Sequence, residues 1–240
     1  MNRIRLDDSI IIKKIEDSKL IVNIDSSMNI IIDDIKYDNH IFNIGNCEVN
    51  ILCNFNNIKK CIYFEFNICG GRLVFNNISN NCCNQNEVFN LKDVSSKVKV
   101  INSYLSYNEE NISVSVFHEN KKTISEIYNC AVTSGNGSVK FDLKTKVDKG
   151  MKDSIVSQNG RIITLNKNNK NQINPVLLID EIDCIANHSA FIGEFKNEEL
   201  FYMLSRGIER KKAINLLIYG FLIGIMEISL KEKEELKKIL

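Results

Sequence analysis

The stretch from Pro175 to Ile208, PVLLIDEIDCIANHSAFIGEFKNEELFYMLSRGI, joins two parts of the chain that differ in sequence pattern. Before it, short runs of β-branched residues alternate with polar turns. After Gly193, apolar residues recur at helical spacing. At the join lies His188, one of three histidines in the chain. The stretch therefore predicts that a β-rich body ends near residue 193 and that a helical tail follows it.

The body, from Ser9 to about Leu165, repeats short apolar runs broken by Asn, Asp, Lys and Gly. Period-two alternation, which is typical of strands with one buried face, is clearest at Ile112, Val114 and Val116 and again at Val139, Phe141 and Leu143. Pairs such as Asn56-Asn57 and Asn80-Asn81 suit turns, because Asn tolerates left-handed backbone. Many short strands fit a sandwich or a solenoid. Asn136-Gly137 is the one candidate for a two-residue hairpin turn, which disfavours a meander of hairpins.

The tail predicts three helices. Asn197 is the expected cap of the first, whose stripe of Leu200, Phe201 and Leu204 ends at Gly207. The second is expected near residues 209–227 and is apolar nearly all round, so either the β-body or a partner protein must cover it. The third, 230–240, is charged on most sides, which is typical of a solvated surface.

Composition narrows the classes of function. The net charge is +1, and hydrophobic residues make up 44% of the chain, so we expect a packed core and no general attraction to nucleic acid or to an anionic membrane. The amino terminus lacks an apolar signal core, and the longest apolar run, 216–226, is far short of the roughly 20 residues that cross a bilayer. We expect a soluble, non-exported, cytoplasmic protein.

The sequence contains no specific motif for binding a metal or a nucleotide. The chain has eight cysteines but no Cys-x-x-Cys pair. We interpret them mainly as small, reduced, buried side chains, with a cluster bound by Cys47, Cys53, Cys61 and Cys69 as the minority alternative. No phosphate-binding loop occurs, so we expect no nucleotide bound by this chain.

The three histidines are interpreted separately. His40 follows Tyr-Asp-Asn and is expected in an exposed turn. His118 continues the alternation of Ile112, Val114 and Val116 and is expected inside the core. His188 alone would also be interpreted as structural, but a neutral imidazole can bind iron, and Cys184 is close in sequence.

The sequence from residue 175 onward resembles the SufB/SufD family, the scaffold subunits of the SUF iron–sulfur cluster assembly machine. The resemblance is specific from residue 147 onward and only architectural before it. The matching residues are Pro175, Leu177, Ile179, Asp183, His188, Ile192, Gly193, Leu200-Phe201-Tyr202, Ser205-Arg206-Gly207-Ile208 and Ala213. Asn159 stands where SufB proteins have a cysteine, so the chain looks like SufD. From the same comparison we expect a short form of the family, without the amino-terminal helical domain of typical SufD proteins.

The resemblance implies a mainly β fold: a right-handed parallel β-helix over residues 1–193, followed by a small α-helical domain over residues 194–240. It implies a non-catalytic scaffold that pairs with a SufB-like subunit, or with itself where only one such gene exists. It also implies docking of SufC, an ABC ATPase, on the helices. The residues expected to bind this partner are Leu200, Phe201, Tyr202, Arg206, Gly207, Leu217 and Phe221.

The same resemblance implies a transient Fe–S cluster or iron at the subunit interface, with His188 as the metal ligand and the residue active in cluster assembly. Two departures from the family pattern lie beside it: Ala186 replaces a cysteine, and Ser189 replaces glycine or glutamate. The alternative from another class is a carbohydrate-binding or adhesive β-helix without cluster chemistry, since a fold does not fix a function. A purely structural module is the remaining interpretation.

Overall fold

The computed structural model describes residues 3–5, 12–16, 19–33, 36–82 and 84–237, and it places sixteen strands and three helices in them. The strands are β1 (Arg3–Arg5), β2 (Ile12–Glu16), β3 (Lys19–Ile24), β4 (Met28–Ile32), β5 (Asn39–Ile44), β6 (Glu48–Asn56), β7 (Ile62–Ile68), β8 (Arg72–Asn80), β9 (Gln85–Leu91), β10 (Lys97–Ser106), β11 (Glu109–His118), β12 (Ile124–Thr133), β13 (Ser138–Val147), β14 (Ser154–Thr164), β15 (Gln172–Ile179) and β16 (Cys184–Gly193). The helices are α1 (Asn197–Ser205), α2 (Arg210–Ile223) and α3 (Leu230–Leu236).

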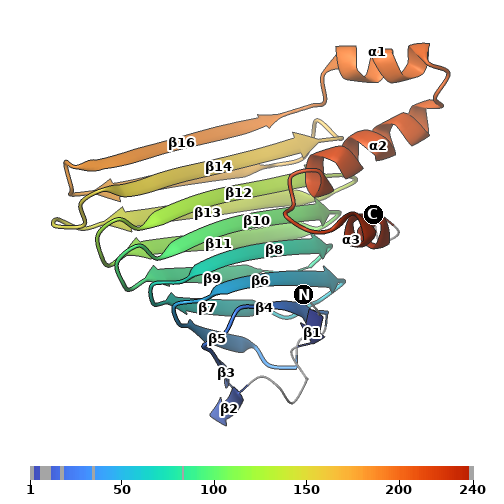
Figure 1. Ribbon diagram of the computed structural model, residues 1–240. Helices are drawn as coiled ribbons and strands as arrows, with labels where there is room; N and C mark the ends of the chain where they lie inside the picture. The colour runs from blue at the N-terminus through green and yellow to red at the C-terminus, as the bar shows by residue number, and fades with distance from the viewer. Residues whose placement is uncertain (1–2, 6–11, 17–18, 34–35, 83, 238–240) are drawn as a thin grey trace.

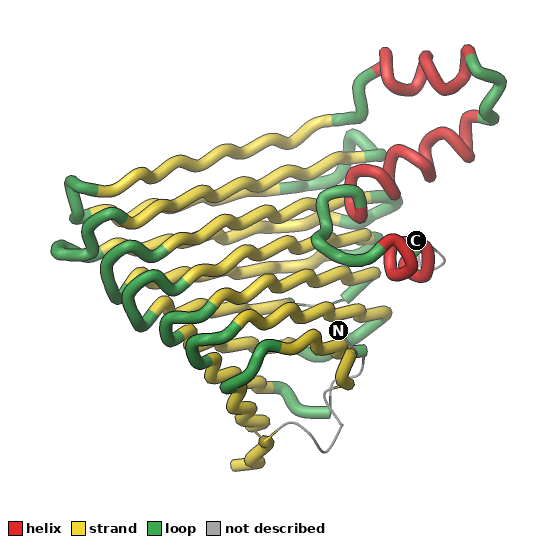
Figure 2. The backbone as a smooth tube through the Cα atoms, in the orientation of Figure 1, coloured by secondary structure: helices red, strands yellow, loops and turns green. Residues whose placement is uncertain are grey.

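From β3 onward, successive strands alternate between two facing sheets (Figure 1). Sheet A has the order β1-β4-β6-β8-β10-β12-β14-β16, and sheet B has the order β15-β13-β11-β9-β7-β5-β3-β2. The pairings within both sheets are parallel, apart from the antiparallel β2–β3 pair. Turns at the two edges carry the chain from one sheet to the other (Figure 2). The expected parallel β-helix is confirmed, and Asn136-Gly137 lies in a turn between sheets, not in a hairpin.

The interior of the β-helix is built from columns of equivalent residues, because paired positions of in-register parallel strands point to the same side. Phe42, Phe66 and Phe89 occupy one such column. The ring centroids of Phe66 lie 5.1 Å from Phe42 and 4.9 Å from Phe89, in stacked geometry. Each aromatic ring thus covers the one in the coil below, and the lumen is filled by side chains.

Asparagine ladders run along the outside of the coils. On sheet B, Asn43 donates to Asn23 at 2.8 Å, Asn67 donates to Asn43 at 2.9 Å, and Asn90 donates to Asn67 at 3.0 Å. At one edge, Asn57 and Asn81 have φ of 53° and 55° and are bonded to each other at 3.2 Å. The asparagine turns expected from the sequence are therefore also stacking positions, since each amide bonds to the one in the next coil.

A second apolar core joins the helices to the outer face of sheet A. It consists of Leu52, Ile78, Ile101, Leu105, Cys130, Val132 and Ile163 from the strands, and Ile218, Leu222, Ile223, Met226 and Leu236 from the helical tail. A polar bond adds to it, since the Ser103 hydroxyl donates to the Leu222 carbonyl at 2.6 Å. The β-body thus covers one side of α2, the first of the two alternatives that its sequence left open.

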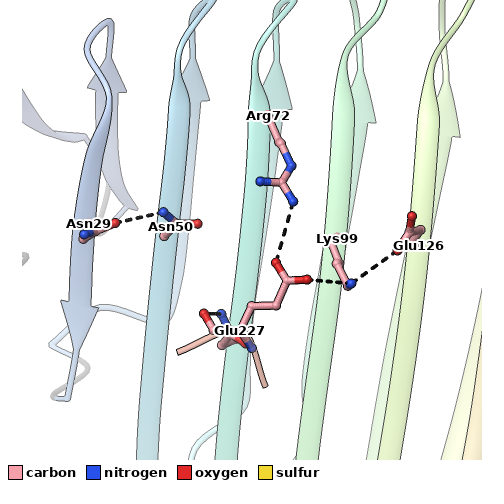
Figure 3. A network of polar contacts seen from close by, with 7 residues as sticks. Asn29, Asn50, Arg72, Lys99, Glu126 and Glu227 are labelled. Atoms are coloured by element: carbon pink, nitrogen blue, oxygen red, sulfur yellow. Dashed lines mark hydrogen bonds and ion pairs between the residues drawn. The ribbon is translucent and has the colours of Figure 1, made fainter. Parts of the chain in front are cut away.

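The loop between α2 and α3 is bonded to sheet A through Glu227, as Figure 3 shows. Its carboxylate accepts from Lys99 at 2.7 Å and lies 3.6 Å from the Arg72 guanidinium. Its backbone N–H donates to the Asn76 amide oxygen at 3.0 Å. These charged side chains are partly exposed, so each pair contributes at most about 1 kcal/mol. The contacts fix the point at which the chain turns back across sheet A.

Two carboxyl groups lie inside the β-helix without a recorded basic partner. Glu87 accepts hydrogen bonds from Asn102 at 2.7 Å and from Asn77 at 3.3 Å. Burial raises the pKa of Glu87 to about 7 and that of Glu110 to about 8. Loss of hydration disfavours the ionised form, and the amide donors offset only part of that effect.

Several sequence predictions need correction. His40 is buried, not exposed, because β5 already begins at Asn39 and places the imidazole 5.2 Å from the Phe64 ring. Lys196, not Asn197, is the cap of α1. Helix α2 ends at Ile223, before the expected residue 227, and α3 ends at Leu236, with residues 238–240 outside the described range.

The prediction for a second histidine is confirmed. His118 is buried as expected, with its ring nitrogens 2.7 Å from Thr123 and 2.8 Å from Ser125. Within the described ranges, no helix has the length and apolar character needed to span a bilayer.

Glu87→Gln should stabilise the chain increasingly as the pH rises from about 4.5 to about 7. The folded carboxyl has the higher pKa, so in this window the folded state keeps a proton that the unfolded state releases, and wild-type stability falls with rising pH. The variant lacks this loss, which we expect to be about 1–3 kcal/mol. Urea titrations at several pH values measure it. Glu48→Gln, which alters an exposed side chain, is the control; identical pH profiles for Glu87→Gln and wild type would contradict the assignment.

Leu222→Ala should destabilise the chain by about 2–5 kcal/mol, because it opens a cavity between α2 and sheet A where the side chain is fully buried. The denaturation midpoint in urea provides the measurement. Leu230→Ala is the matched control, since Leu230 is 81% exposed. If both variants unfold at the same midpoint, the second core does not hold the helices.

Candidate functional site at the open end of the β-helix

The last coil, formed by β15 and β16, lies at one end of both sheets (Figure 1). Each strand pairs on one side only within the described chain, so its other edge presents unpaired backbone groups. Such an edge can pair with a strand of another chain. Exposed apolar side chains gather on these strands and on the turn between them: Val176, Leu178, Ile182, Ile185, Phe191 and Ile192.

His188 lies on β16 in this last coil. Its Cα pairs with that of Gln158 on β14, and Gln158 is fully buried and faces the lumen. In-register parallel pairing places the two side chains on the same side of the sheet, so His188 is on the lumen side. The ring is nevertheless exposed, because no described coil follows to cover it. An imidazole at this position is accessible to a metal or to another chain.

The two neighbours of His188 on β16 bond to β14 from the outer face. Ser157 donates to the Asn187 amide oxygen at 3.2 Å, and Ser189 donates to the Asn159 amide oxygen at 2.5 Å. Ser189, one of the two departures from the family pattern, is therefore bonded to Asn159, which stands where SufB proteins have a cysteine. Together these bonds fix the register of β16 on both sides of the histidine.

Arg161 connects the last coil to the helical tail. Its guanidinium lies 5.8 Å from the Phe191 ring centroid on β16 and 5.3 Å from the Phe221 ring centroid on α2. Phe221 also contacts Phe195 edge-on at 6.2 Å. Cation–π contacts of this kind contribute about 0.5–1 kcal/mol at partly exposed sites. Sequence reasoning did not single out Arg161, because nothing in a single chain reveals which aromatic rings will flank a cation.

The residues expected to bind a partner through the helices differ in how exposed their side chains are. Phe201 and Tyr202 on α1 are 73% and 61% exposed, and Arg206 lies over the Tyr202 ring. Leu200 and Leu217 are half-buried, and Gly207 ends α1 with φ of 77°. Phe221, in contrast, packs within the chain. Phe201 and Tyr202 are therefore neighbours on α1, the helix that follows the carboxyl end of β16 (Figure 1).

The tail also carries a hollow of about 250 Å³. Its lining residues are Lys212, Asn215, Leu216, Ile218, Tyr219 and Lys237.

The cysteines are dispersed. Among the seven in the described ranges, all are free thiols; Cys53, Cys82 and Cys130 are buried, Cys47, Cys69 and Cys184 are half-buried, and Cys61 is exposed. The interpretation as buried hydrophobes thus fits some of them and fails for Cys61. Burial raises the pKa of Cys130 to about 12, so this thiol stays protonated near neutral pH. Within the described part of the chain, no group of three or more His, Cys, Asp or Glu side chains is placed to hold a metal ion.

Comparison with known proteins bears on this end of the molecule. Residues 72–221 match the family model described as "SUF system FeS cluster assembly, SufBD core domain". The chain belongs to the SufBD core family. The match runs from β8 through β16 into α2, so it includes the last coil, α1 and most of α2. The resemblance to SufB/SufD proteins is confirmed.

Individual relatives agree with the family match. Over 117 residues the chain is 32% identical to the iron–sulfur cluster assembly protein SufD of Bacillus subtilis, covering 49% of this chain and 27% of that protein. It is 41% identical over 66 residues to a SufBD family protein of Pyrococcus horikoshii (27% and 14% coverage). It is 27% identical over 116 residues to the ycf24 SufBD family protein of Galdieria sulphuraria (48% and 52% coverage). The matched region thus spans about half or less of each of these relatives.

Proposed function

We propose that this chain is a scaffold subunit for Fe–S cluster assembly in the SUF system. Its open β-helix end faces a SufB-like subunit or a second copy of the same chain, and its helical tail docks a SufC-like ABC ATPase. The observation that carries the proposal is the exposed His188 on an unpaired edge strand of a SufBD core domain. The relatives named as cluster assembly proteins support the same role and favour it over a carbohydrate-binding β-helix.

Subunit pairing at the last coil follows from its surface. Unpaired backbone groups on β15 and β16 favour strand-to-strand contact, and the exposed apolar side chains beside them favour burial. Ile182, at 94% exposure in the β15–β16 turn, is the most exposed of these side chains. The mass of the purified chain in solution, measured with and without a SufB-like subunit, distinguishes self-pairing from heteropairing.

In this role the cluster is the substrate of assembly, and His188 supplies one nitrogen ligand to iron. Thiolates, the usual ligands of iron–sulfur clusters, come from the partner subunit. This division is supported by the cysteines: Cys130 faces α2 instead of the last coil, and Cys184, although on the same face of β16 as His188, lies four residues, about 13 Å, along the strand from it. The chain itself hydrolyses nothing; ATP-driven motion comes from the docked ATPase.

Docking of the ATPase is assigned to the exposed face of α1. Phe201 and Tyr202 present two large aromatic side chains to solvent, and aromatic side chains are enriched in the energetically dominant parts of protein interfaces. Arg161 joins α2 to β16, so a displacement of the tail would be transmitted to the strand that carries His188.

His188→Ala should lower the rate of cluster formation by at least about tenfold in the complex with SufB-like and SufC-like partners, because a first ligand to iron is removed. Anaerobic reconstitution followed by visible absorption measures the rate. Leu230→Ala is the control, since it alters an exposed side chain on α3, outside the last coil. Cluster formation by His188→Ala at the wild-type rate would remove the histidine from the mechanism.

The double substitution Phe201→Asp and Tyr202→Asp should weaken SufC-like ATPase binding about 100-fold or more, because two desolvated aromatic contacts are lost. Both side chains are exposed, so the fold should be unaffected. Titration calorimetry with the purified ATPase measures the affinity, and Leu230→Asp on α3 is the control. Unchanged affinity for the double variant would place the docking site elsewhere.

A further inference from the structure

We propose that Gln158 is a positioning residue for His188: its side-chain carbonyl accepts a hydrogen bond from one imidazole N–H and so fixes the ring orientation and the tautomer. The structure does not contain this hydrogen bond; the strand register and the unpartnered Gln158 oxygen support it. Its consequence for cluster assembly rests on the proposed function of His188.

The register of β14 and β16 brings the two side chains together. Gln158 pairs with His188, and both lie on the lumen side of sheet A. Adjacent strands are about 4.8 Å apart, so side chains of these lengths at paired positions are within hydrogen-bonding reach. The Ser157–Asn187 and Ser189–Asn159 bonds on either side hold this register.

Only one of the two polar atoms of the Gln158 side-chain amide has a hydrogen-bond partner. Its Nε2 donates to the Thr145 hydroxyl at 3.3 Å, which ties the side chain to sheet B. Its Oε1 is buried and has no hydrogen-bond partner, although the residue is fully buried. Buried carbonyl oxygens are normally bonded, so a free one identifies a donor that the described arrangement does not yet supply.

His188 is the donor available at that position. The structure records no hydrogen bond, ion pair or ring contact for it with any described residue. Its imidazole is exposed, and a neutral imidazole carries one N–H. The Gln158 side-chain oxygen and the His188 N–H both lack a partner, and both lie on the same side of the paired strands.

Gln158 differs in polarity from the other residues of its column. Below it, the equivalent positions of sheet A are Ile51, Phe75, Val100 and Ile127, all buried and apolar. The column becomes polar only in the coil directly beneath His188. A polar residue at this point gives up apolar contact and gains a fixed acceptor under the histidine.

A hydrogen bond to the imidazole of His188 would favour iron binding. An imidazole that binds iron through one nitrogen keeps its proton on the other, and the partner of that N–H sets the tautomer and the ring orientation. Gln158 is itself held by Thr145, so its carbonyl is a fixed acceptor. Loss of such a partner typically lowers metal affinity or activity about 10- to 100-fold.

The test is the ¹⁵N spectrum of the imidazoles in the full chain at alkaline pH, with His188 assigned by His188→Ala. In the wild type, one nitrogen of His188 should show the shift of a protonated nitrogen and the other that of an unprotonated one. Gln158→Leu should give averaged shifts of two interconverting tautomers. Gln158→Glu keeps an acceptor oxygen and should restore the single tautomer. Ile127→Val, a small change one coil further down the same column that leaves Gln158 and Thr145 in place, is the matched control.

Averaged shifts in the wild type would overturn the proposal, even if Gln158→Leu failed to fold. In the reconstituted complex, Gln158→Leu should slow cluster formation about 10- to 100-fold, and Gln158→Glu should stay within a few-fold of wild type. If His188→Ala forms clusters normally, the proposed function fails, and the tautomer spectrum still decides whether the hydrogen bond exists. A fixed tautomer in both wild type and Gln158→Leu would also contradict the role of Gln158.

Discussion

In-register parallel pairing between successive coils is the constraint on which the rest of this structure depends. Each backbone ladder aligns equivalent positions of neighbouring coils, so a residue chosen at one position faces the residue at the same position in the next coil. Apolar positions become filled columns such as Phe42–Phe66–Phe89, and asparagine positions become ladders of amide bonds. Each backbone hydrogen bond contributes little alone, but all of them must keep one register for either kind of column to form.

The same geometry explains why the two faces of the β-helix differ. Strands of sheet B, such as β11, alternate between buried and partly exposed residues because their outer face is not covered. The carboxyl-terminal halves of β10 and β12 are buried on both sides, because α2 packs over them. The helical tail is therefore a cover for one face of the solenoid as well as a candidate docking element, and Glu227 fixes its return across the sheet.

A solenoid must end, and the last coil leaves its lumen side and its strand edges uncovered. In a monomer this would be a liability for aggregation. In the proposed pairing with another subunit, it is a surface at which lumen-facing residues are accessible. His188 is such a residue: further down the column its equivalents are packed side chains, and only its place in the terminal coil exposes it.

The strands, the helical tail and the family could be predicted from the sequence. The alternation of apolar residues at 112–116 and 139–143 predicted strands. The change to helical spacing of apolar residues after Gly193 located the helical tail, and the sequence motif at residues 175–208 identified the family. These features depend on local periodicity and on residues close together in the chain, which a sequence displays directly. His40 was placed wrongly because a polar tripeptide before it resembled a turn, whereas the register of β5 with β7 carries it inward.

The tertiary structure alone decided which residues share a column or an interface. Gln158 and His188 are thirty positions apart, as are Asn159 and Ser189, and Arg161 meets rings from β16 and α2. Such neighbours are set by coil length and register, which vary with every turn and have no signature in a single chain. Local sequence thus determined the elements and the family, and the stacking of the coils decided which side chains meet at the open end, because contact across a solenoid depends on register and not on distance along the chain.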